Sequence, residues 1–201
     1  MTSAATVSEV ERYDVATIVG GGAKLGTVTA VGVMIFALVS RPLDGFAETL
    51  IQSVLILAGG LVVSYAPGLL VRVRTIDGLG WTALLGLMGA LFFTLFDVVL
   101  LRPFDIYHWT WDQIGGGSGF WYIPVWFMGS AFLATLGGMN ISKAPNRELM
   151  VLGARTLIMS VVLFTVIAAS GLFPPTSAVM ALAFSLGLAL DLVVTAVQSK
   201  G

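Results

Sequence analysis

Three charged residues whose side chains could take part in chemistry lie inside long apolar runs of this sequence. Asp97 lies near the end of one run, and Arg155 and Asp191 lie at equal distances from Phe173, which two prolines follow. A charge inside a lipid bilayer is costly unless it is partnered, so each residue marks a candidate site. The prolines predict a tight hairpin, and Arg155 and Asp191 are therefore expected at similar depth on antiparallel helices, where they would form an ion pair.

The expected Arg155–Asp191 pair has two interpretations. It could fix the register of the two helices, or it could lie on a proton or ion pathway, as a small transporter would require. Asp191 follows Ala183 and Gly187 at four-residue spacing, so it lies on the helix face expected to meet a neighbour. This spacing is compatible with both roles, which stay open at this point.

Asp97 is the residue expected to be catalytic if the protein is an enzyme. Arg41, Glu48 and Arg102 are expected at the same outer membrane boundary, where they could line a polar vestibule or pair at the interface. Catalysis would need Asp97 and Glu48 to meet at one substrate in a cleft that excludes water. Spacing alone does not establish such a cleft.

An aromatic segment follows Asp97 and holds the single histidine. The candidate ligand or partner surface comprises His108, Trp109, Trp111, Trp121, Tyr122 and Trp126. Tryptophan and tyrosine gather at membrane interfaces, so the concentration of aromatic residues in this segment can be explained without a ligand. His108, with Asp105 and Asp112 three and four residues away, could form a weak metal face or an axial ligand for a pigment's magnesium, but a solvated histidine is the ordinary alternative.

The common catalytic and metal-binding motifs are absent from the sequence. The glycines of residues 115–119 and 20–22 lack the Lys-Ser/Thr offset of a phosphate-binding loop. Neither His-Glu-x-x-His nor Gly-x-Ser-x-Gly occurs, and a lone histidine without cysteines predicts no zinc site. The motifs therefore favour a protein that is not an enzyme.

The composition is that of a membrane protein. Of the 201 residues, 57% are hydrophobic and only 10% are charged, which leaves too little polar surface for a soluble globule and makes lipid the main solvent. The net charge of −1 argues against a nucleic-acid partner, which would need a basic face. Residues 1–14 lack the pattern of a cleaved signal peptide.

The apolar runs predict an all-α bundle of six transmembrane helices in a single domain. The expected spans are residues 16–39, 47–71, 79–101, 120–140, 149–171 and 176–197, with an extracytoplasmic aromatic loop at 102–119. With the N-terminus in the cytoplasm, that side collects eight of the ten lysines and arginines. Both termini are therefore expected to be cytoplasmic, in the inner membrane of a bacterium.

Small residues recur at four-residue spacing on four of the expected helices. They are Gly22, Gly26 and Ala30; Gly86 and Ala90; Ser130, Ala134 and Gly138; and Ala183 and Gly187. Such stripes let helix backbones approach closely in lipid. We expect them to pack within the bundle, with docking of a partner as the alternative.

Residues 96–130 resemble bacterial carotenoid-biosynthesis membrane proteins of the carotenoid hydratase type. The resemblance lies in Asp97, in Trp109-Thr110-Trp111, in the glycine run and in the aromatic-Ile-Pro segment at 121–127. It implies an intramembrane enzyme that acts on an isoprenoid, with Asp97 as its acidic residue.

Three functions follow, in this order. The first is a non-catalytic subunit of a larger respiratory or photosynthetic membrane complex, packed against partner helices and against lipid, carotenoid or a chlorophyll-type pigment. The second is an intramembrane enzyme acting on an isoprenoid or other lipid through Asp97. The third is a small transporter that uses Arg155 and Asp191.

Overall fold

The described residues form helices and no strands, which confirms the all-α part of the predicted fold class for them. The computed structural model describes residues 11–104, 106, 122–144 and 149–198. The elements are α1 (Val15–Ser40), α2 (Gly45–Val71), α3 (Ile76–Phe96), η1 (Asp97–Leu101), α5 (Tyr122–Lys143), α6 (Leu149–Ala169) and α7 (Ser177–Gln198). The expected third span is thus two elements, because the π-helical turn η1 continues α3.

Five helices of the described chain are long and apolar enough to cross a membrane. They are α1, α2, α3 continued through η1, α6 and α7, each of 21 residues or more, close to the roughly 20 residues that one crossing needs. The chain is therefore a helical membrane protein. The remaining helix, α5, has 22 residues but is the least apolar, with Ser130, Thr135 and Asn140 along its length.

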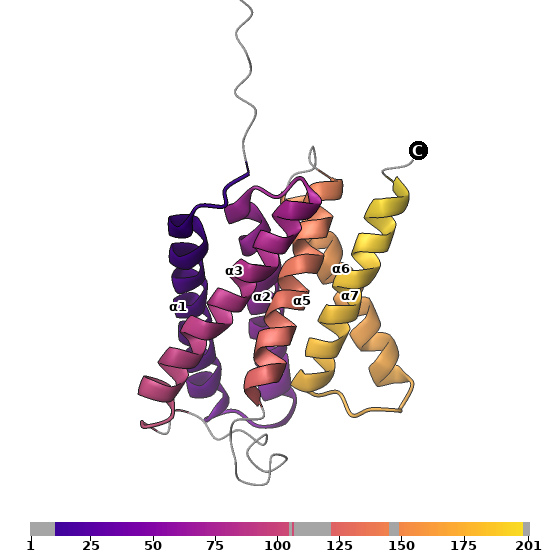
Figure 1. The fold of residues 1–201 in the computed structure, drawn as a ribbon. Helices are drawn as coiled ribbons and strands as arrows, with labels where there is room; N and C mark the ends of the chain where they lie inside the picture. The colour runs from indigo at the N-terminus through magenta and orange to yellow at the C-terminus, as the bar shows by residue number, and fades with distance from the viewer. Residues whose placement is uncertain (1–10, 105, 107–121, 145–148, 199–201) are drawn as a thin grey trace, which may run out of the picture.

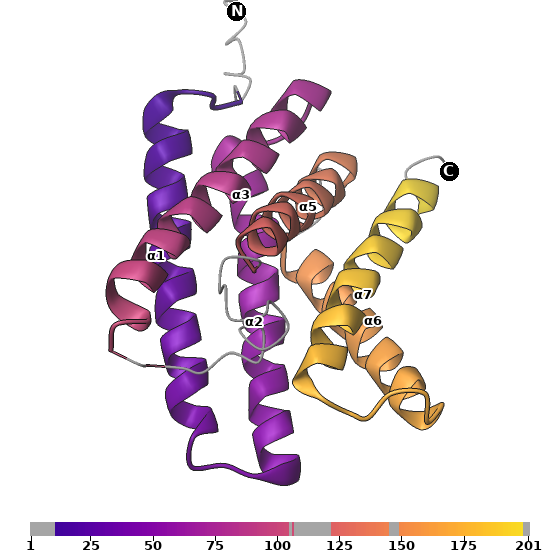
Figure 2. The ribbon, with the colours of Figure 1, turned by 60° about the horizontal axis from the view of Figure 1, so that its bottom comes forward.

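The helices form a layered bundle in which neighbours in sequence run in opposite directions (Figure 1). α3 lies between α1 and α5, while α2 contacts α1, α3, α5 and α7. α6 stands at one edge and packs mainly on α7 (Figure 2). α1 begins and α7 ends at the same end of the bundle, so the described chain enters and leaves on one side (Figure 1).

Local signals explain where the helices of the first half begin and end. Asp14 caps α1 by accepting a 2.9 Å hydrogen bond from the Thr17 N–H, and Thr75 caps α3 by accepting from the Gly78 N–H. Such caps satisfy N–H groups that have no partner within the helix. α2 ends at Val71 because the next residue, Arg72, has a left-handed backbone with φ of 57° that stops the helix.

The segment before α1 is fastened to the beginning of α3 by Glu11. Its carboxylate accepts hydrogen bonds from the N–H groups of Arg74 and Thr75, from the Thr75 hydroxyl and from the Tyr13 hydroxyl. Partial burial raises the pKa of Glu11, but the hydrogen bonds from Thr75, Tyr13 and Arg74 outweigh it and lower the pKa to about 2. An ionised carboxylate at a helix N-terminus also interacts favourably with the helix dipole.

Small residues allow the helices to approach one another closely inside the bundle. A Cβ atom added at Gly26 of α1 would lie 2.7 Å from the backbone oxygen of Gly89 in α3. One added at Gly86 of α3 would lie 2.8 Å from the Ser130 oxygen in α5. The small-residue stripes of these helices therefore pack within the chain, and van der Waals contact replaces the hydrophobic drive that lipid removes.

The closest approach joins α2 to α5. A Cβ atom added at Gly137 would lie 2.1 Å from the backbone oxygen of Ser64. Because the obstacle is backbone rather than a flexible side chain, any larger residue must push the two helices apart.

We expect Gly137→Ala to lower the free energy of unfolding by about 1–3 kcal/mol, the usual cost of overpacking a core. The measurement is chemical or thermal unfolding of the purified protein in mild detergent. The matched control is Gly129→Ala on the same helix, where no described atom beyond the adjacent helix backbone lies within 4 Å of the added Cβ. The assignment of this contact is wrong if both variants unfold alike.

Candidate functional site

The structure brings Arg155 of α6 and Asp191 of α7 into contact. The Arg155 Nε atom donates a 2.7 Å hydrogen bond to Asp191 Oδ1, and the carboxylate is fully buried. The Arg155 side chain is 19% exposed, and its Nη atoms also reach the Asp191 carbonyl oxygen, the Thr195 hydroxyl and the Gln198 side chain. The guanidinium therefore binds acceptors along two turns of α7.

Hydroxyl and amide groups continue inward from this ion pair. Thr156 Oγ1 lies 3.2 Å from Asp191 Oδ2, and the Tyr65 hydroxyl lies 2.8 Å from Thr156 Oγ1. Asn140 Nδ2 lies 3.5 Å from the Tyr65 hydroxyl and 3.5 Å from the Leu188 carbonyl oxygen. We call Asn140, Tyr65, Thr156 and Asp191 the polar chain, and it connects α5, α2, α6 and α7.

The polar chain has a defined direction. Thr156 has a single hydroxyl proton, which it donates to the Asp191 carboxylate, so the Tyr65 hydroxyl must donate to Thr156. The Asn140 amide in turn donates to Tyr65. Every donor thus points toward Asp191, whose buried carboxylate is the last acceptor of the chain.

One end of the polar chain is incomplete. Asn140 is fully buried, and its Oδ1 atom accepts no hydrogen bond from the described residues. The Ser53 and Ser64 hydroxyls are likewise buried without a described partner. An unsatisfied polar group is expensive in an apolar interior, so Asn140 is held at an energetic cost.

Asp97 forms a second ion pair, at the opposite end of the bundle. Its carboxylate is fully buried and lies 3.0 Å from Arg102 Nε. The Arg102 N–H also donates to the Asp97 carbonyl oxygen, the i→i+5 bond of a π-helix, which brings residues five apart together. Of the other residues expected here, Arg41 donates to the Ile106 carbonyl oxygen and Glu48 accepts from Gln52.

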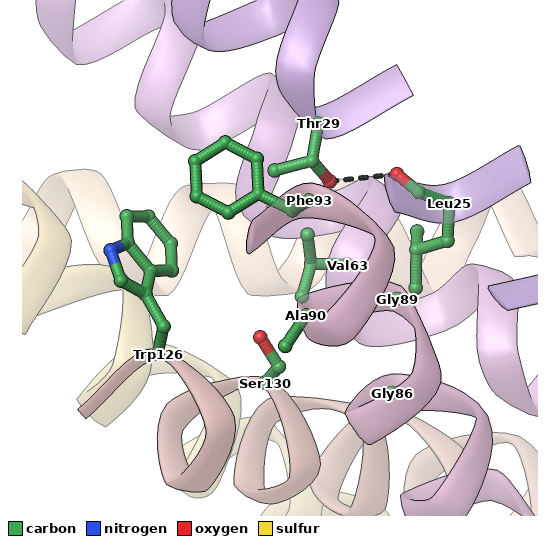
Figure 3. A pocket seen from close by; sticks show the side chains of 9 residues that line it. All are labelled: Leu25, Thr29, Val63, Gly86, Gly89, Ala90, Phe93, Trp126 and Ser130. Atoms are coloured by element: carbon green, nitrogen blue, oxygen red, sulfur yellow. Dashed lines mark hydrogen bonds between the residues drawn. The ribbon is translucent and has the colours of Figure 1, made fainter. Parts of the chain in front are cut away.

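Trp126, from the expected aromatic surface, lines a small apolar cavity of about 20 Å³ between α1, α2, α3 and α5 (Figure 3). Its ring lies 5.2 Å from that of Phe93, centroid to centroid. Leu25 and Val63 complete the apolar wall, and the Ser130 side chain points toward the space. The cavity has room for about one water molecule, but an apolar lining favours a dry space.

The other residues of the expected aromatic surface fall outside the described part of the chain. They are His108, Trp109, Trp111, Trp121 and the side chain of Tyr122. Among the residues that are described, no group of three or more histidine, cysteine or acidic side chains could hold a metal ion.

Sequence reasoning missed three members of the polar chain. Tyr65, Asn140 and Thr156 are polar residues within otherwise apolar helices, and that contrast was the available signal. It does not reveal which of the many such hydroxyls and amides converge, because they come from three different helices.

The chain matches no family model, and neither the curated proteins nor the solved structures contain a match.

Removing one partner of the buried ion pair should destabilise the protein. Arg155→Met leaves the Asp191 carboxylate without its counter-charge, and we expect a loss of about 3 kcal/mol in the free energy of unfolding. The matched control is the double variant Arg155→Met/Asp191→Leu, which removes both charges and should recover most of that loss. Unfolding in detergent measures both, and a double variant no more stable than Arg155→Met would contradict the cost assigned to the unpaired carboxylate.

Proposed function

We propose that the chain is a non-catalytic subunit of a larger membrane assembly. The observation that carries the proposal is a pair of outward-facing glycines, Gly32 in α1 and Gly59 in α2. Both are exposed, and apart from the backbone of their own helix turns no described atom lies within 4 Å of the position that a Cβ atom would take. Glycine in a helix interior costs about 0.5–1 kcal/mol relative to alanine, and packing within the described chain does not account for these two.

Small residues on an outer helix face suit a partner helix that approaches backbone to backbone. The edge helix α6 offers further surface, because only Leu152, Thr156 and Ser160 are buried along it. We infer that partner helices cover part of these faces and that lipid, or a carotenoid or chlorophyll-type pigment, covers the rest. An assembly of the respiratory or photosynthetic kind would provide such neighbours.

We further propose that α5 is a sixth crossing. It lies beside α2, α3 and α7, all of which qualify as membrane spans. The excess of lysine and arginine then favours cytoplasmic termini in the inner membrane of a bacterium.

The variant Gly59→Leu distinguishes an effect on assembly with partners from an effect on the stability of the isolated chain. Leucine has the higher helix propensity, so we expect the isolated chain to gain up to about 1 kcal/mol in the free energy of unfolding. In native membranes, the same variant should lose the stoichiometric complex that the wild-type protein forms on native gels in mild detergent. Val28→Leu, which adds only one methylene group on the exposed face of α1, is the control. A wild-type protein that migrates alone, without partners or pigment absorbance, contradicts the proposal.

A second candidate is an intramembrane enzyme acting on an isoprenoid, as the resemblance to carotenoid hydratases implies. The observation that favours it is the π-helical turn at Asp97, a feature frequent at functional sites, with the carboxylate buried beside Arg102.

For this candidate, Asp97→Asn should abolish turnover of a candidate isoprenoid, because an amide cannot act as a general acid or base. Product formation is measured by chromatography after co-expression with the isoprenoid. Asp77→Asn, in the first turn of α3, is the control and should retain turnover at an unchanged folded yield. Turnover that survives Asp97→Asn excludes this residue.

A further inference from the structure

Lys24 is a charged residue on the outside of a membrane-spanning helix. It lies within α1, which is long and apolar enough to cross a membrane, and its side chain is exposed. No hydrogen bond or ion pair joins it to a described residue, because the two buried aspartates pair with Arg155 and Arg102 instead. A charge inside a membrane span is costly unless it is paired, so the partner of Lys24 is expected from outside the bundle.

Lys24 belongs to a continuous outer face of α1. This helix stands at an edge of the bundle and packs on α3 and α2 (Figure 1). Gly26 is buried against α3, and Lys24 points away from it because a helix turns by about 100° per residue. Val31 and Ile35 are exposed on the same side as Lys24, and Gly20 lies one turn before it. We call Gly20, Lys24, Val31 and Ile35 the outer face of α1.

Gly20 leaves open space beside the Lys24 side chain. Apart from the backbone of its own helix turn, no described atom lies within 4 Å of the position that a Cβ atom would take at Gly20. At Gly22, by contrast, an added Cβ would meet Met88 of α3. Because small residues let helices approach closely in lipid, a neighbouring helix can bring a side chain next to the Lys24 ammonium.

The depth of Lys24 favours a protein partner over a lipid headgroup. Asp14 caps α1, and the adjacent Tyr13 stacks on Trp81 with ring centroids 5.7 Å apart. Tyrosine and tryptophan mark the level of the headgroups. Lys24 follows Asp14 by ten residues, about 15 Å along the helix, and a stem of four methylene groups covers only part of that distance. A helix, unlike a lipid headgroup, can carry a carboxylate at this depth.

We infer that the outer face of α1 binds a transmembrane helix of a partner subunit that presents an aspartate or glutamate to Lys24. This inference rests on the proposed function and names the chemistry of the partner. The ion pair satisfies both charges within lipid, and Gly20 gives the carboxylate room beside the ammonium. Apolar residues alone would not select one partner helix, because lipid solvates them equally well, whereas a buried charge rejects helices without a counter-charge.

The first test measures the lifetime of the complex in mild detergent on native gels. Lys24→Met leaves the partner's carboxylate unpaired, so we expect the complex to dissociate at least about tenfold faster than the wild-type complex. Lys24→Arg keeps the positive charge and should retain most of the lifetime. Thermal unfolding of the isolated Lys24→Met chain should show no loss of stability, because no described residue pairs with Lys24, and this readout separates assembly from folding.

The second test identifies the group that faces Lys24. Dicyclohexylcarbodiimide, which dissolves in lipid, is added to native membranes, where it activates a carboxyl group. The Lys24 amine then forms an amide with that carboxyl group as dicyclohexylurea leaves. We expect a cross-linked product in which a branched peptide joins Lys24 to an acidic residue of a partner subunit. Lys24→Arg should keep the complex but lose this product, and the other lysines, Lys143 and Lys200, are the same in both proteins.

The outcomes distinguish this inference from the proposed function. A wild-type protein that migrates alone contradicts the proposed function itself. A wild-type complex whose lifetime Lys24→Met does not change, and which gives no cross-link to Lys24, overturns only the inference. Loss of a co-purified anionic phospholipid from Lys24→Met at an unchanged lifetime of the complex would assign Lys24 to a lipid phosphate and would also overturn it.

Discussion

A charged side chain inside lipid must have a counter-charge, and the attachment of α6 to this protein depends on that constraint. α6 packs mainly on α7, where Arg155 and Asp191 form their ion pair. Thr156, the next residue of α6, extends the contact to α2 through the Tyr65 hydroxyl. The polar groups thus hold the edge helix in one register against α7 and α2, which lipid-facing apolar surface cannot do because lipid solvates it equally well.

In the rest of the bundle, the close approach of helix backbones holds the helices together. Gly26 meets α3, Gly86 meets α5, and Gly137 meets the backbone of Ser64 in α2. At these contacts a side chain would separate the helices, so van der Waals attraction between backbones supplies the association. Gly32 and Gly59 are exposed and meet no described atom outside their own helices, and for this reason they indicate a surface rather than a core.

The two buried aspartates differ in how their charges are paired. Asp97 reaches Arg102 within one stretch of helix, because the π-helical turn brings residues five apart together. Asp191 reaches Arg155 across two helices and also joins a series of hydroxyl groups. A local pair forms whatever the neighbouring helices do, whereas the Asp191 pair exists only when α6 and α7 are docked.

The sequence by itself determined that the protein is helical and embedded in a membrane, because long apolar runs with few charges have no other stable arrangement in lipid. It also indicated Arg155 and Asp191 as a pair, since the hairpin at Phe173 places both at one depth. Only the tertiary structure decided that a π-helical turn, η1, continues α3, and that Tyr65, Thr156 and Asn140 converge on Asp191. The physical reason is that hydropathy records the cost of leaving water for each residue separately. Hydrogen bonds between helices depend on rotation and crossing angle, which the packing of small residues sets for the whole bundle at once.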